Sequence, residues 1–153
     1  MEYNIKSGDL ITWKDTKGFF NNTIRIFTLS EYTHVGIAVV EEDGVYVVEA
    51  VRPTVRKIKL SERTPFQVIP MNVEYTSESD SFLNNLVGRE YSILQAVLSF
   101  FNIYINDDKW YCTELGHEFY SRVGIEFDKH LTPTRFIRQA IVYSGKTFYV
   151  ESI

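Results

Sequence analysis

The sequence has a single cysteine, Cys112, in 153 residues, which excludes an intramolecular disulfide framework and a zinc site built from several thiolates. Basic residues are not in excess: 16 Lys and Arg against 20 Asp and Glu give a net charge of −4, which argues against nucleic acid as a partner. Long hydrophobic runs are also missing. The most apolar stretch, 92–105, is too short to cross about 30 Å of hydrocarbon at about 1.5 Å per residue.

The chain shows no internal repeat, no low-complexity tract and no linker, and its four prolines are scattered. We therefore expect one domain over residues 1–153. The first nine residues contain no basic region followed by an apolar run, so no signal peptide is predicted and the expected location is the cytoplasm. Delivery to the cell envelope without a cleaved leader stays open.

Hydrophobic periodicity predicts strands in the first half of the chain and mostly helices in the second half. Strands are expected at 10–13, 34–40, 45–50, 55–60 and 66–71. Helices are expected at 20–27, from Ser77 or Ser79 to Val87, at 92–105, at 112–122 and at 133–140, followed by a terminal hairpin of 141–143 with 147–150. This order predicts an α+β fold with an antiparallel sheet packed against helices.

Cys112 is predicted to lie at the start of a helix. Unpaired backbone N–H groups and the positive end of the helix dipole lower the pKa of a thiol there, and the thiolate is the nucleophilic form. The structural alternative is a small buried hydrophobe, since Trp110 and Tyr111 come directly before it.

A thiolate nucleophile needs a base, and the base needs an orienting group. His34 begins an apolar strand, and Glu49 stands in an otherwise apolar run, where a buried carboxylate must be paired or hydrogen-bonded. A four-residue loop at 41–44 would place Glu49 opposite Gly36 and diagonal to His34, about 7 Å away. A two-residue loop at 43–44 would separate them by about 13 Å, and a three-residue loop would put them on opposite faces.

The other two histidines carry no motif. His117 lies five residues after Cys112, about 140° around the helix, and faces elsewhere. We expect His117 and His130 to be surface or capping residues, and we predict no metal site and no cofactor.

Five short segments are informative together because of their order along the chain. They are Ser7-Gly8-Asp9-Leu10-Ile11, Tyr32 to Ile37, Val45 to Ala50, Gly88-Arg89-Glu90-Tyr91 and Trp110 to Leu115. This series resembles the circularly permuted NlpC-type papain-like hydrolases of the YaeF/YiiX group, over residues 7 to about 140. The resemblance implies a permuted papain-like fold in which Cys112 is the nucleophile, His34 the base and Glu49 the orienting acid. It also implies that Tyr91 lies near the active site as an oxyanion donor.

This sequence departs from the family's pattern at several positions. Thr113 stands where the family usually has serine. In addition, 20 residues separate Tyr91 from Cys112 in this sequence. The role of the insertion 92–109 stays open, and several relatives of this group look exported.

The leading hypothesis is a cysteine hydrolase that cleaves amide bonds of small peptides or cell-wall peptides through a thioacyl intermediate. A second hypothesis is a lipid-directed thiol acylhydrolase or acyltransferase, because related permuted proteins act on acyl groups and because 92–105 is strongly apolar. A third is a catalytically silent binding module of a virus or mobile element. The expected partner is a small peptide-like or acyl substrate, and the oligomeric state stays open.

Overall fold

A computed structural model describes residues 3–14, 32–92, 110–129 and 132–153. The described residues form an antiparallel sheet in the order β4-β3-β2-β1-β5-β6. Its strands are β1 (Leu10–Lys14), β2 (Tyr32–Glu41), β3 (Gly44–Ala50), β4 (Val55–Lys59), β5 (Phe66–Ile69) and β6 (Phe148–Val150). The helices are α2 (Ser77–Leu86), α4 (Cys112–Arg122), α5 (Pro133–Ser144) and the short 3-10 helix η1 (Leu60–Arg63). The α+β class and the antiparallel sheet are confirmed.

Side-chain caps define the starts of two helices. Thr76 caps α2, where its hydroxyl accepts from the Ser79 N–H in a capping box; the predicted caps, Ser77 and Ser79, both lie inside the helix. Thr132 caps α5 in the same way, with Pro133 as the first helical residue.

The terminal hairpin predicted from 141–143 and 147–150 is wrong. Helix α5 continues through Ser144 and ends at Gly145, whose left-handed φ of 68° closes the helix. Strand β6 pairs with β5 instead, with Gln67 opposite Tyr149. The position of 141–143 directly before Ser144-Gly145-Lys146 favoured a strand, but Ile141 packs against the core as a helical residue.

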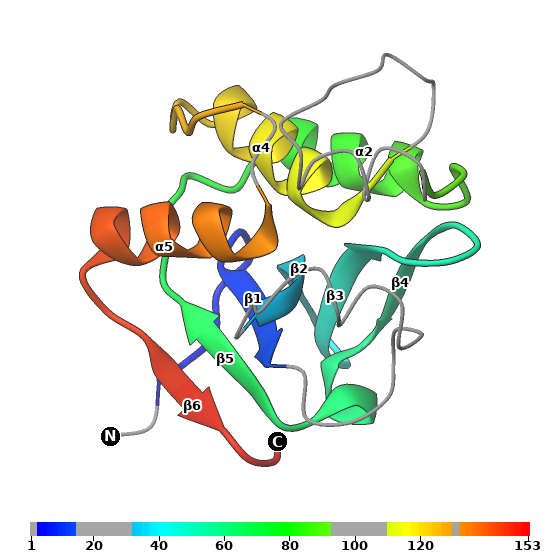
Figure 1. Ribbon diagram of the computed structural model, residues 1–153. Helices are drawn as coiled ribbons and strands as arrows, with labels where there is room; N and C mark the ends of the chain where they lie inside the picture. Colours follow the sequence, from blue (N-terminus) through cyan, green and yellow to red (C-terminus); the bar gives the residue numbers. More distant parts are fainter. Residues whose placement is uncertain (1–2, 15–31, 93–109, 130–131) are drawn as a thin grey trace.

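The sheet has two differently covered faces. Helices α2, α4 and α5 lie over one face (Figure 1). There, alternate strand residues such as Val35 and Ile37 pack with Leu115, Phe119 and Phe136 of the helices. On the other face a smaller cluster buries Ile11, Trp13, Ala38, Val47, Leu60, Phe66 and Val68.

The predicted helix 20–27, and all of the predicted helix 92–105 except Ser92, lie outside the described residues. Within the parts of the chain that the structure describes, no helix is long and apolar enough to span a bilayer.

Candidate functional site

The hairpin of β2 and β3 brings His34 and Glu49 together. Gly36 pairs with Glu49, which is the register expected from a loop at 41–44, but Glu41 also pairs with Gly44, so the loop itself is shorter than predicted and consists of residues 42–43. His34 and Glu49 therefore lie diagonally on one face of the sheet. His34 Nε2 lies 2.7 Å from Glu49 Oε2, and both side chains are buried. The prediction that Glu49 must have a partner is confirmed.

Two arginines, which belong to no motif of the sequence, also bind the Glu49 carboxylate. Arg56 is the cross-strand partner of Glu49 on β4, and its Nε and Nη2 donate to Oε1 at 2.9 and 2.7 Å. Arg63, at the end of η1, donates from Nη1 to Oε2, the same oxygen that faces His34. Both oxygens of this buried carboxylate therefore have hydrogen-bond donors, as a fully buried charge requires.

Trp13 contacts Arg63 in two ways. The Arg63 guanidinium lies 4.1 Å from the centre of the Trp13 ring, and Trp13 Nε1 donates to the Arg63 carbonyl at 2.9 Å. Trp13 is also the cross-strand neighbour of His34, with ring centres 5.4 Å apart. One tryptophan thus packs against both the imidazole and the guanidinium that contact Glu49.

The electrostatics of the pair favour a neutral imidazole. Burial, followed by the positive charges of Arg63 and Arg56, lowers the pKa of His34 well below 6.5. Neutral His34 donates its Nε2 hydrogen to Glu49, which leaves Nδ1 as the basic nitrogen of the ring.

Cys112 begins α4, as predicted, but its pKa shifts in the opposite direction from the prediction. Burial raises the pKa of the thiol to about 11. The backbone N–H groups of Val35, Thr113 and Cys112 and the charge of Arg63 lower it only in part. The thiol is 5% exposed, so the loss of water outweighs the helix N-terminus.

Tyr91 lies beside the start of α4 because the chain returns on itself there. Tyr91 and Trp110 form a parallel bridge, Ser92 N–H donates to the Trp110 carbonyl at 2.8 Å, and Trp110 N–H donates to the Glu90 backbone carbonyl at 2.8 Å. The two ends of the insertion therefore meet two residues before Cys112. Burial raises the pKa of Tyr91, and the charge of Cys112 adds to that shift, which indicates their proximity.

The four predicted residues gather at one end of the sheet, but not in one layer. Cys112 belongs to the cluster under the helices, with Val35. Successive side chains of a strand point to opposite faces of the sheet. His34 and Glu49 therefore lie on the face opposite to that layer, together with Trp13. The backbone N–H of Val35 and the charge of Arg63 both lower the pKa of Cys112, which couples the two layers electrostatically.

His117 Nε2 lies 3.1 Å from the Phe127 carbonyl oxygen, a contact that involves none of the predicted catalytic residues. His130 lies outside the described residues.

A pocket runs along the outer side of the first turns of α4. It is lined by the residues on both sides of Cys112 and by polar side chains further along: Trp110, Tyr111, Thr113, Glu114, His117, Glu118 and Lys129.

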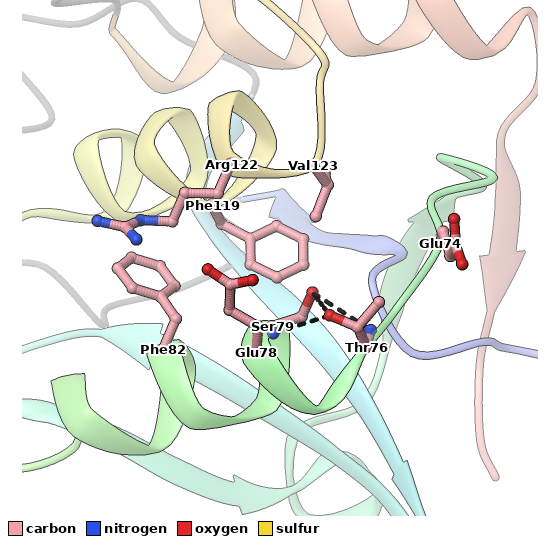
Figure 2. A pocket seen from close by; sticks show the side chains of 8 residues that line it. All are labelled: Glu74, Thr76, Glu78, Ser79, Phe82, Phe119, Arg122 and Val123. Atoms are coloured by element: carbon pink, nitrogen blue, oxygen red, sulfur yellow. Dashed lines mark hydrogen bonds between the residues drawn. The ribbon is translucent and has the colours of Figure 1, made fainter.

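A second pocket lies between α2 and α4, away from the predicted site (Figure 2). Phe82 and Phe119 form its apolar part, and the Arg122 guanidinium lies 4.4 Å from the Phe82 ring centre. Arg122 is also bound to Glu118, one turn earlier. The Arg122 charge is therefore paired with Glu118 within α4.

No protein-family model matches the sequence, and a search among curated proteins finds no match. Among solved structures, the fold is similar to the crystal structure of metalloprotein YiiX from Escherichia coli O157:H7, DUF1105. The TM-score is 0.63 and the identity 18%, with 99% of each chain covered. The fold is therefore YiiX-like, and the permuted papain-like assignment remains a prediction.

That neighbour is described as a metalloprotein. Within the described ranges, no group of three or more His, Cys, Asp or Glu side chains is placed to hold a metal ion. The one carboxylate bound to a buried histidine, Glu49, already carries two guanidinium groups, whose charge opposes a cation. The described residues therefore do not fit a metal centre.

Proposed function

We propose that the protein is a cysteine-dependent hydrolase that cleaves amide bonds of small peptides or cell-wall peptides. Cys112 would be the nucleophile, His34 the base and Glu49 the group that orients the imidazole. The observation that carries the proposal is the buried His34–Glu49 pair. The strand that supplies His34 also supplies the backbone N–H of Val35, which lowers the pKa of Cys112.

The proposed reaction starts from neutral partners. His34 Nδ1 takes the thiol proton as the Cys112 sulfur attacks the substrate carbonyl, and the imidazolium then gives that proton to the leaving amine. Water, deprotonated by His34, hydrolyses the thioacyl group. The backbone N–H of Cys112 and the hydroxyl of Tyr91 are the candidate donors to the oxyanion. This route suits a thiol whose pKa is about 11 and an imidazole that stays neutral.

The pocket beside α4 supports a peptide-like substrate. Tyr111 and Thr113, the neighbours of Cys112, line it together with Glu114, Glu118 and Lys129. Such side chains can donate and accept hydrogen bonds along a peptide backbone, whereas an acyl chain needs an apolar channel. The segment that motivated a lipid substrate, 92–105, lies outside the described residues except for Ser92.

Alkylation by iodoacetamide tests the proposed pair directly, because the chain has one cysteine and every label is on Cys112. The labelling rate of the wild type near neutral pH should fall about 100-fold in His34→Gln, in line with the contribution of a general base. His117→Gln is the matched control, since this histidine borders the same pocket but binds the Phe127 carbonyl. The rates of all three proteins should converge as the pH approaches 11.

Equal labelling of the wild type and His34→Gln at every pH would contradict the proposal.

Mass spectrometry after incubation with an activated peptide ester supplies a second readout. An acyl adduct on Cys112 should form in the wild type and be lost in Cys112→Ala. The same measurement with a fatty-acyl ester separates the lipid-directed alternative, and no adduct with either ester would favour the silent binding module.

A further inference from the structure

The C-terminal part of the chain exposes apolar side chains to an unusual degree. Six large hydrophobic side chains of the described residues are exposed, and four of them lie in the last twelve residues. These are Val142, Tyr143, Tyr149 and Ile153, and Val142 is 84% exposed. A concentration of this kind is unusual on a free protein surface and indicates a contact with something else.

Val142 and Tyr143 belong to α5, and Tyr149 belongs to β6, the element that follows α5 directly in the chain. Helix α5 buries Phe136, Ile137 and Ala140 against the sheet, so Arg135, Arg138 and Val142 follow its outer side. Tyr149 is opposite Gln67 and lies on the helix-covered face of the edge strand β6. Ser144 Oγ donates to the Pro70 carbonyl at 2.6 Å and fixes the end of α5 beside β5. Figure 1 shows α5 and β6 at the same side of the molecule.

The charge of this surface differs from that of the remaining chain. Residues 133–153 contain three basic residues, Arg135, Arg138 and Lys146, and one acidic residue, Glu151, which gives +2. The rest of the chain has 13 basic and 19 acidic residues and a charge of −6. Neither Arg138 nor Lys146 is paired with a described carboxylate, and both are exposed.

We propose that α5 and β6 form a docking surface for an anionic lipid bilayer. The surface is defined by Arg135, Arg138, Val142, Tyr143, Lys146 and Tyr149. Basic side chains bind anionic headgroups, tyrosine rings lie at the headgroup level, and an aliphatic side chain inserts just below. A cationic surface on an otherwise acidic protein also orients the molecule, because the remaining surface is repelled by the same bilayer. The inference does not depend on the proposed hydrolase reaction.

Vesicle co-sedimentation tests the docking surface. The full chain should bind vesicles of phosphatidylcholine with phosphatidylglycerol and should not bind vesicles of phosphatidylcholine alone. Arg138→Gln/Val142→Ser should weaken binding roughly 50-fold, about fivefold from the charge and about tenfold from the apolar side chain. Added salt should weaken binding of the wild type, because it screens the basic residues.

Val87→Ser/Arg89→Gln is the matched control, because it makes the same chemical changes at an exposed valine and arginine after α2. This control should bind like the wild type. Equal binding to both kinds of vesicle, or equal loss in the two double variants, would overturn the proposal. A dimer in solution that Arg138→Gln/Val142→Ser dissociates, without binding to vesicles, would overturn it as well and assign the surface to a second copy of the chain.

Discussion

Replacing Glu49 with glutamine tests the core of the site without any knowledge of the substrate. Glu49→Gln keeps the size of the side chain and removes its charge. The carboxylate is fully buried and accepts from His34, Arg56 and Arg63. A glutamine offers one acceptor oxygen, and its NH2 group would face donors of the same kind. The two guanidinium groups would then lose their counter-charge.

The expected cost follows from the exposure of each partner. Breaking a buried ion pair on one side costs about 3–5 kcal/mol, and a surface pair is worth at most about 1 kcal/mol. Arg56 is 37% exposed and can regain water, whereas Arg63 is 14% exposed and cannot do so fully. We therefore expect the free energy of unfolding to fall by about 3 kcal/mol, mostly through Arg63. Urea unfolding followed by tryptophan fluorescence measures this, because Trp13 packs against Arg63.

Glu41→Gln is the matched control on the neighbouring strand. Glu41 is 40% exposed and pairs with Lys57, so its loss should cost less than about 1 kcal/mol. Adding Arg63→Met to Glu49→Gln should recover part of the stability, because the guanidinium left without a counter-charge is removed. If Glu49→Gln costs no more than Glu41→Gln, the Glu49 carboxylate is hydrated in solution and the reasoning about the buried cluster is refuted.

Three further predictions concern the same end of the sheet. Gly36→Ala should lower the urea midpoint by the equivalent of about 1–3 kcal/mol, because its Cβ would lie 2.5 Å from Val47 Cγ2 and 3.0 Å from the Val48 carbonyl oxygen; an unchanged midpoint would contradict this. Between pH 9 and 11 the wild type should lose up to about 2.7 kcal/mol more stability than Cys112→Ala, since unfolding releases a thiol proton held with a pKa of about 11; equal losses would refute the buried thiol. Below pH 6.5 the unfolded chain protonates His34 before the folded protein does, so the thermal midpoint of the wild type should fall faster than that of His34→Gln; parallel curves would disprove the lowered pKa.

Local sequence patterns predicted the β2–β3 hairpin and the start of α4, but not which of three registers the hairpin adopts. Each loop length was compatible with the same alternation of apolar residues, and only the 41–44 register places Glu49 opposite Gly36. Gly36 itself carries a signal for that register, because a side chain there would collide with the Val48 carbonyl oxygen and Glu49 Cβ. The cross-strand distance between two particular residues is thus fixed by steric contacts that a periodicity argument does not include.

The thiol pKa shows a different limit of local reasoning. The N-terminus of α4 lowers the pKa of Cys112 in the structure, as the sequence predicted, through the N–H groups of Thr113 and Cys112. Burial raises the pKa by more, and burial depends on how α4 packs against β2 and β3, far away in the sequence. A dipole effect falls off within one turn, whereas desolvation acts on the whole charge. Position on a helix therefore does not decide the protonation state of its first residue.

Arg56 and Arg63 change how the proposed reaction must begin. With His34 neutral, Glu49 and the two arginines sum to one positive charge. Burial, followed by the charges of Arg63 and Arg56, holds His34 neutral; Arg63 also lowers the pKa of Cys112, but burial of the thiol raises that pKa by more. A thiolate and an imidazolium at rest would leave the net charge unchanged but would place two further charges in a buried environment, where the loss of hydration is costly. The cluster therefore favours a neutral thiol and imidazole at rest, with charge separation only when a substrate carbonyl accepts the electron pair of the sulfur.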